Sequence, residues 1–240
     1  MGQMLRTPDQ RFDDLPGYAF RAHYLDGLAG CGDSRIHYLD EGPAQAARVY
    51  LCLHGQPTWS YLYRRMLPVF VAAGHRVVAP DLLGFGRSDK PAGDDAYSFT
   101  RHREMLLSLV EHLALRDIVL VVQDWGGLLG LTLPMEEPAR YAGLLVMNTA
   151  FATGDQPLGR GFLDWRDYSN RHPDLAVGKL LSRACPHLNA AEAAAYDAPF
   201  LDADVASNIR NCPPPLEVPD GGHFLPEWGE AVAAAALEAL

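Results

Sequence analysis

The sequence predicts an α/β fold in which helices flank a mostly parallel β-sheet. Segments at about 48–53, 75–79, 118–123 and 142–148 are almost uniformly apolar, as strands buried on both faces should be. Segments between them, near 59–73, 99–114 and 127–137, carry apolar residues at helical spacing. Strand and helix patterns that alternate along a chain indicate parallel strands joined by crossover helices. With 240 residues, 48% of them hydrophobic and 21% charged, the chain can bury a large core as one domain with a small insertion.

The remaining elements are less regular. The segment Arg35–Leu39 alternates between polar and apolar residues, which predicts a half-exposed strand. Pro68 falls inside the first helical segment, where it should kink or break the helix. The Ala-rich residues Glu227–Leu240 predict a terminal helix.

Charge and cysteine content limit the classes of partner. The net charge of −10 argues against nucleic acid or an anionic membrane surface as a partner. No segment is apolar enough to span a bilayer, and the N-terminal segment lacks the apolar core of a secretory signal. The cysteines lack metal-ligand or Cys-x-x-Cys spacing, which favours free thiols in the cytoplasm; they are Cys31, Cys52, Cys185 and Cys212.

The segment Gln123-Asp124-Trp125-Gly126-Gly127 ends one predicted strand and opens a helix. A strand, a sharp turn and a helix form a nucleophile elbow, which lifts one side chain above the sheet beside a helix N-terminus. A carboxylate at this position suits displacement at a saturated carbon, with later hydrolysis of the resulting ester. The alternative is that Asp124 only caps the helix.

Two further motifs precede the elbow. The segment His54-Gly-Gln-Pro-Thr-Trp-Ser60 again joins a strand to a helix start through a turn, and Asp81-Leu-Leu-Gly-Phe-Gly-Arg-Ser-Asp-Lys-Pro91 forms a Gly-rich, charged loop. Taken by itself, the first segment could be an ordinary strand–turn–helix junction, and the second could be a structural loop. In this order, the three motifs resemble those of the α/β-hydrolase superfamily, and within it the haloalkane dehalogenases that bind the halide with two tryptophans.

The resemblance implies an α/β-hydrolase fold with a small helical cap, and it implies roles for particular residues. Asp124 would attack the halogen-bearing carbon, and the backbone N–H groups of Gln56 and Trp125 would form the oxyanion hole. The indole N–H groups of Trp125 and Trp165 would bind the departing halide, since an indole offers a donor and no competing acceptor. The implied substrates are a small haloalkane and water, with no metal and no organic cofactor.

Residues 151–200 differ in character from the flanking sequence. Leu163–Asn170 and Asp174–Ala184 predict short helices, and Asn189 with Glu192 predicts a capping box that opens a third. We expect a main domain over 1–150, a helical cap over 151–200 that contains Trp165, and the end of the main domain over 201–240. The alternative for Trp165 is that it only packs the cap onto the main domain.

His223 follows a short predicted strand near Leu216 and precedes the terminal helix, where this superfamily places its general base. The other histidines lack such a setting, and His54 is expected to make a structural hydrogen bond. His223 would activate the water that hydrolyses the ester on Asp124.

The carboxylate that should orient His223 is not found. The interval between the cap and the last strand is too short for a strand, a helix and their loops, so one penultimate strand/helix unit and its acid are expected to be missing, with the join near Ala206–Ser207. Asn148, after the preceding strand, cannot act as an anion. Either a segment is omitted or deleted, or a nearby carboxylate replaces the acid, namely Asp202, Asp204 or Asp220. Without its strand, His223 is expected to lie out of reach of Asp124.

The function predicted from the sequence is hydrolytic cleavage of carbon–halogen bonds by a cytoplasmic, monomeric enzyme. Two alternatives stay open. An epoxide hydrolase would share the Asp nucleophile and would use a cap tyrosine, for which Tyr168 is the candidate. A non-catalytic homologue that binds small apolar ligands would fit the missing acid.

Overall fold

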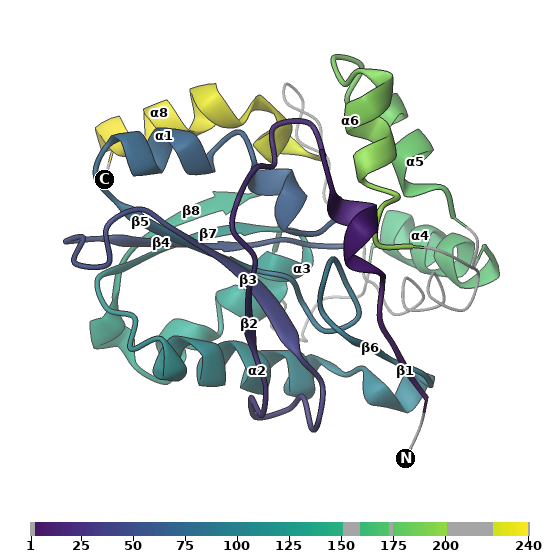
Figure 1. Cartoon of the computed structure of the whole chain (residues 1–240), viewed down its shortest axis with the longest axis horizontal. Helices are drawn as coiled ribbons and strands as arrows, with labels where there is room; N and C mark the ends of the chain where they lie inside the picture. Colours follow the sequence, from purple (N-terminus) through teal and green to yellow (C-terminus); the bar gives the residue numbers. More distant parts are fainter. Residues whose placement is uncertain (1–2, 151–158, 173–174, 201–222, 240) are drawn as a thin grey trace.

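The computed structural model describes residues 3–150, 159–172, 175–200 and 223–239. Six strands form one sheet in the order β2-β3-β5-β4-β7-β8 (Figure 1). The β4 strand pairs in parallel with β5 and β7, β7 pairs in parallel with β8, and the β2–β3 and β3–β5 pairs are antiparallel. The predicted, mostly parallel sheet is therefore confirmed. The strands are β2 (His23–Leu25), β3 (Ile36–Glu41), β4 (Val49–Leu53), β5 (Arg76–Pro80), β7 (Ile118–Gln123) and β8 (Tyr141–Met147), and β1 (Met4–Leu5) pairs separately with β6 (Lys90–Pro91).

Helices cover both faces of the sheet (Figure 1). The α1 helix (Leu67–Ala72) and α8 helix (Gly229–Ala239) lie on one face, and α2 (Phe99–His112) and α3 (Trp125–Gly130) lie on the other. Short 3₁₀ turns connect them: η1 (Asp9–Phe12), η2 (Ser60–Tyr63), η3 (Asp94–Ala96), η4 (Leu133–Met135), η5 (Pro138–Arg140) and η7 (Leu225–Trp228).

Alternate residues of each central strand enter different cores. In β7, Val119 and Val121 belong to the core that includes residues of α1 and α8, while Leu120 and Val122 belong to the core that includes residues of α2 and α3. Side chains of a strand point alternately to the two faces of the sheet, so a strand covered on both faces must be apolar throughout. This explains the uniform apolar segments of β4, β5 and β7. The prediction that 142–148 is buried on both faces was wrong, because alternate residues of β8, including Leu144 and Val146, are exposed.

The structure corrects three other predicted elements. The segment 59–73 is divided into η2 and α1, and Pro68 lies in the first turn of α1, where the helix needs no N–H donor. The segment 127–137 is likewise divided, because α3 ends at Gly130 and η4 follows. The prediction that 35–39 is half-exposed was wrong, because β3 lies between β2 and β5 and His37 on it is fully buried. The His37 ring can be buried because its Nδ1 atom has a polar partner, a carboxylate oxygen of Asp81 at 2.7 Å.

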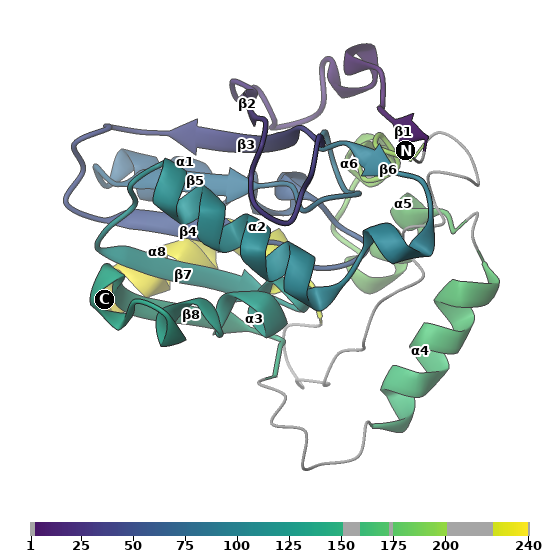
Figure 2. The same ribbon diagram turned by 90° about the horizontal axis from the view of Figure 1, so that it is seen from below.

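Three helices form the predicted insertion at one end of the sheet: α4 (Arg160–Arg171), α5 (Val177–Ala184) and α6 (Ala190–Ala195) (Figures 1 and 2). The predicted capping box is present, since Asn189 Oδ1 accepts the N–H of Glu192 at 2.9 Å and the Glu192 carboxylate accepts the N–H of Asn189 at 3.1 Å. The α4 helix stands apart from the sheet in Figure 2, and Leu163 on it is exposed. The domain limits at 150 and 200 stay a prediction.

The expected gap in the sheet falls outside the residues that the structure describes. The join near Ala206–Ser207, the last strand near Leu216, Cys212 and the candidate acids Asp202, Asp204 and Asp220 all lie outside the described residues. Within the described part of the chain, the sheet ends at β8 and no helix is long and apolar enough to cross a membrane.

Candidate active site

Asp124 stands at the sharp turn between β7 and α3. Its φ of 52° and ψ of −125° bend the chain, and its carbonyl accepts the first helical bond, from the N–H of Leu128 at 3.2 Å. The Asp124 side chain accepts the N–H of Trp125, the first residue of α3, but makes no N-cap hydrogen bond further into the helix, so its role as a simple helix cap is not supported. A non-glycine residue with positive φ is strained and recurs at functional sites. The elbow predicted from the sequence is therefore present.

Two glycines after Asp124 allow the elbow to pack closely. A Cβ atom at Gly126 would lie 1.9 Å from the carbonyl oxygen of Leu53, and one at Gly127 would lie 2.2 Å from the Thr149 side chain. Any larger residue would push α3 away from the ends of β4 and β8. Thr149 fixes the turn further, because its hydroxyl donates to the Asp124 carbonyl at 2.7 Å.

Backbone amides from two different loops hold the Asp124 carboxylate. The N–H of Gln56 donates to Oδ1 at 2.8 Å, and the N–H of Trp125 donates to the same carboxylate. Gly55 makes the approach possible, since a Cβ atom there would lie 2.3 Å from Oδ1. The structure thus brings together the two N–H groups predicted to form the oxyanion hole.

The environment of Asp124 changes its proton affinity. The side chain is buried, and desolvation raises the pKa of Asp124 to about 7, although the amides of Trp125 and Gln56 act in the opposite direction. A carboxylate with few stabilising charges around it is a stronger nucleophile than one in water.

His223 lies next to the carboxylate, and the expectation that it would be out of reach was wrong. Its Nε2 atom is 3.6 Å from Asp124 Oδ2. Burial lowers the pKa of His223 to about 4, so its imidazole is neutral near pH 7, as a general base must be.

Gln123 fixes the tautomer of His223 through a contact that the sequence did not reveal. Its side-chain amide lies 2.9 Å from His223 Nε2 and donates to the His223 carbonyl at 3.1 Å. An amide N–H is a donor only, so Nε2 acts as an acceptor and the ring proton is on Nδ1. The only signal in the sequence was the position of Gln123 directly before Asp124.

The position that a triad acid would occupy can also be identified. Among the described residues, His223 Nδ1 is buried and has no hydrogen-bond partner. No carboxylate in the described part of the chain contacts Nδ1; the candidate acids Asp202, Asp204 and Asp220 lie outside it, so the acid stays a prediction.

A buried ion pair anchors the segment that carries His223. Arg64, directly after η2, donates two hydrogen bonds to Glu227 in η7, at 2.7 and 2.9 Å. Arg64 also donates to Glu192 of α6 at 3.1 Å, and the Tyr196 hydroxyl donates to Glu227. The α6 helix, the residue that follows η2 and the His223 segment thus meet at one guanidinium group.

His54 and Asp81 support the site without touching it. His54 Nε2 accepts the N–H of Leu82 at 3.0 Å, which leaves the ring proton on Nδ1 to donate to the Gly55 carbonyl at 2.9 Å. The Asp81 carboxylate accepts the backbone N–H groups of Ser60 and Arg87. Both motifs thus fix the loop that carries Gln56, and the structural role expected for His54 is supported.

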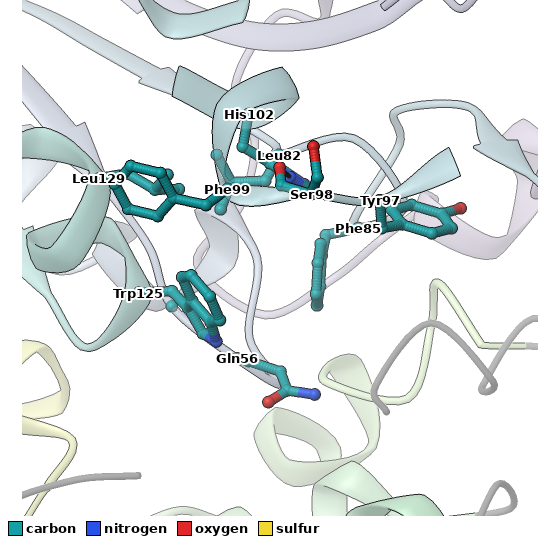
Figure 3. Close-up of a pocket in the computed structure, with 10 residues that line it drawn as sticks. Gln56, Leu82, Phe85, Tyr97, Ser98, Phe99, His102, Trp125 and Leu129 are labelled. Atoms are coloured by element: carbon teal, nitrogen blue, oxygen red, sulfur yellow. Dashed lines mark hydrogen bonds between the residues drawn. The ribbon is translucent and has the colours of Figure 1, made fainter. Parts of the chain in front are cut away.

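A cavity of about 280 Å³ adjoins the elbow (Figure 3). Trp125 and Gln56 form its wall next to Asp124, and the remaining lining residues are Gly55, Leu82, Phe85, Tyr97, Ser98, Phe99, His102 and Leu129. The second predicted halide ligand, Trp165, is not among these lining residues. It lies half-buried on α4, where its ring stacks on Tyr168 at 6.0 Å between centroids.

Among the described residues, no group of His, Cys, Asp or Glu side chains could hold a metal ion. Cys31, Cys52 and Cys185 are buried free thiols.

Known proteins share both this fold and this sequence. A family model described as the alpha/beta hydrolase fold matches residues 49–175. A haloalkane dehalogenase of Psychrobacter cryohalolentis is 48% identical over 214 residues, covering 88% of this chain and 70% of that protein. One from Mycolicibacterium paratuberculosis is 45% identical over 212 residues, with the same coverage. The solved tetrameric structure of haloalkane dehalogenase DpaA from Paraglaciecola agarilytica matches with a TM-score of 0.92 and 38% identity, over 99% of each chain.

The elbow, the two amides and the parallel sheet define an α/β hydrolase. Within that class, the chain belongs to the haloalkane dehalogenase family. The curated relatives are longer than this chain, since 88% of it aligns with 70% of each of them.

Proposed function

We propose that this chain hydrolyses the carbon–halogen bond of haloalkanes through an ester on Asp124. The observation that carries the proposal is the buried Asp124 carboxylate, with Gln56 and Trp125 amides on it and His223 at 3.6 Å. An Asp oxygen attacks the saturated carbon, a C–O bond forms, and the halide leaves with the electron pair of the broken bond.

Water completes the reaction. His223 Nε2 accepts a proton from water while the water oxygen attacks the ester carbonyl of Asp124. The oxygen held by Gln56 and Trp125 then carries the negative charge of the tetrahedral intermediate, where both N–H groups stabilise it. Collapse of this intermediate breaks the bond between the carbonyl carbon and the alkyl-bearing oxygen, and the leaving alkoxide takes the proton held by His223 and departs as the alcohol. Loss of the remaining proton of the water restores the Asp124 carboxylate, so the net products are alcohol, halide and a proton.

The halide would be held by indole N–H groups. Trp125 supports this role because it lines the cavity beside Asp124. In Figure 3 its indole nitrogen points toward Gln56, the end of the cavity nearest the elbow. For Trp165 the support is the family resemblance alone, since a direct role needs α4 to approach the cavity.

The two alternatives, an epoxide hydrolase and a non-catalytic ligand-binding homologue, gain less support. Tyr168, the candidate acid of an epoxide hydrolase, is exposed on α4 and stacks between Trp165 and His172. The relatives reported above carry the name of dehalogenases, which favours halide chemistry over epoxide opening or simple ligand binding.

An oligomer is better supported than the monomer predicted from the sequence. The DpaA structure is described as tetrameric. Leu144 and Val146 on β8 are about half exposed, which suits an apolar contact with another chain. The free buried thiols support a cytoplasmic location.

The test is direct measurement of bromide and acid release from bromoethane by purified protein. Stoichiometric bromide, acid and ethanol would support the proposal. Turnover of an epoxide with no bromide release from any bromoalkane would overturn it.

A further inference from the structure

We propose that Tyr63 is a positioning residue for the oxyanion hole, because its hydroxyl group connects the ends of the two strands that lead to Gln56 and Asp124. The inference rests on the proposed function and adds a residue that acts through the backbone. Tyr63 ends η2 and is fully buried. Its ring packs in the same core as Cys52 of β4 and Val121 of β7, so packing fixes the place of its hydroxyl group.

The Tyr63 hydroxyl contacts two backbone carbonyl groups at one end of the sheet. It donates to the Leu53 carbonyl at 2.7 Å, and the carbonyl oxygen of Val121 lies 3.4 Å away. Leu53 ends β4, and Val121 belongs to the last turn of pairing before β7 ends. The loop after β4 carries the Gln56 amide, and the elbow after β7 carries Asp124. One hydroxyl group therefore connects the two strand ends whose loops form the site.

The Leu53 carbonyl is also in close contact with α3, since a Cβ atom at Gly126 would lie 1.9 Å from its oxygen. Leu53 precedes by three residues Gln56, whose N–H donates to Asp124 Oδ1 at 2.8 Å. Gln56 and Asp124 are 68 positions apart in the chain, so the alignment of this N–H depends on how the ends of β4 and β7 are held together. Without the Tyr63 hydroxyl, the Leu53 carbonyl would be free to shift, and the Gln56 N–H would shift with it.

The Tyr63 hydroxyl keeps its proton while Asp124 ionises. Burial raises the pKa of Tyr63 well above its ordinary value, and the nearby Cys52 and Asp124 side chains act in the same direction. The pKa of Asp124 is about 7, so the hydroxyl is a donor on both sides of that ionisation. Its role is to hold the backbone carbonyl, which needs a partner where it is buried.

Misalignment of the Gln56 N–H should slow only one of the two half-reactions. In ester formation the Asp124 carboxylate loses negative charge, so the N–H stabilises the starting state more than the transition state. In ester hydrolysis the oxygen that this N–H contacts gains negative charge, so the N–H stabilises the transition state. Loss of the Tyr63 hydroxyl should therefore slow hydrolysis and spare ester formation.

The experiment removes one hydroxyl group at a time from the same 3₁₀ turn. Tyr63→Phe keeps the ring in the core and loses the bond to Leu53. Tyr61→Phe is the matched control, because Tyr61 is also fully buried in η2 and its hydroxyl donates to the carbonyl of Pro16 in the N-terminal segment at 2.8 Å. Each variant loses a hydroxyl–carbonyl bond, so the two melting temperatures should fall by similar amounts.

Single-turnover rates with bromoethane at about pH 9, where the Asp124 carboxylate is ionised, separate the two steps. Tyr63→Phe should slow ester hydrolysis at least about tenfold and change ester formation less than about twofold. Tyr61→Phe should change both rates less than about twofold. Equal slowing of hydrolysis in the two variants, or equal slowing of both steps in Tyr63→Phe, would overturn the proposal.

A titration that needs no turnover separates this proposal from the proposed function. The Gln56 N–H favours the charged form of Asp124, so a weaker bond should move the half-titration of Asp124 to higher pH in Tyr63→Phe but not in Tyr61→Phe. The readout is carboxyl ¹³C NMR, with Asp124→Asn to identify the Asp124 signal.

An unchanged half-titration in Tyr63→Phe would overturn the positioning role. The expected upward shift, found together with no bromide release by the unmodified protein, would instead overturn the proposed function and leave the positioning role of Tyr63 standing.

Discussion

His223 Nε2 lies 3.6 Å from Asp124 Oδ2, although no strand among the described residues after β8 leads to His223. The histidine is held from its C-terminal side. Glu227, four residues further along, forms the buried ion pair with Arg64, and Phe224 packs into the core beside it. This anchoring explains how the His223 imidazole is held beside the Asp124 carboxylate.

Replacing the nucleophile should abolish catalysis. In Asp124→Asn, an amide cannot displace bromide, so bromide release should fall by at least about a thousandfold. The measurement is halide release from bromoethane, with the mass of the protein checked to exclude deamidation back to Asp. Retained activity in an undeamidated variant would show that another group is the nucleophile.

Replacing the base should separate the two half-reactions. His223→Gln should still form the ester on Asp124 but should not hydrolyse it, since no group takes the proton from water. Intact-protein mass spectrometry after mixing with bromoethane should show one added ethyl group. Normal turnover without a trapped adduct would rule out His223 as the base.

The halide site can be tested by titration. Bromide should quench tryptophan fluorescence, and Trp125→Phe should weaken bromide binding about tenfold through loss of a charge-assisted hydrogen bond. Trp165→Phe tests the second donor in the same assay. An unchanged bromide affinity in Trp165→Phe would assign that residue to packing on α4.

The Arg64–Glu227 pair should be needed both for stability and for the position of His223. Glu227→Ala leaves the buried Arg64 guanidinium without its main partner, which should cost about 3 kcal/mol of unfolding free energy. It should also slow ester hydrolysis more than ester formation. The control is Glu230→Ala, whose side chain is exposed near Arg65 and should change stability by less than about 1 kcal/mol. If Glu227→Ala slowed ester formation and ester hydrolysis equally, Glu227 would not act by positioning His223.

Ester formation should accelerate as the pH rises through about 7, because burial raises the pKa of Asp124 to about 7 and the protonated acid is not a nucleophile. Burial lowers the pKa of His223 to about 4, so the base stays neutral over this range. Single-turnover rates from about pH 5 to about pH 9 should follow one ionisation. A rate that does not change over this range would contradict the assignment.

The free energy of unfolding should depend on pH through the same ionisation of Asp124. Between pH 3.8, the ordinary pKa of the carboxyl group, and about 7, the folded protein binds a proton on Asp124 that the unfolded chain has lost. The contribution of Asp124 to stability therefore falls with rising pH, by up to about 1.4 kcal/mol per unit. Asp124→Asn should lack this loss and gain stability relative to the parent between pH 4 and pH 7. Parallel stability curves for the two proteins would argue against a raised pKa.

The sequence by itself determined the features that depend on local order along the chain. Periodic apolar residues predicted the strands and α2, the Asp124-Trp125-Gly126-Gly127 segment predicted the elbow, and Asn189 with Glu192 predicted the capping box. These depend on neighbouring residues, since side-chain alternation, tight turns and helix caps are set within a few positions.

Only the tertiary structure decided which distant groups meet. The burial of His37 depends on Asp81, the tautomer of His223 depends on Gln123, and the position of His223 depends on Arg64. The cavity is likewise formed by residues from four separate segments. Hydrogen bonds and desolvation act through space, so their partners, and the pKa values of Asp124 and His223 that follow from them, are fixed only when the chain has folded.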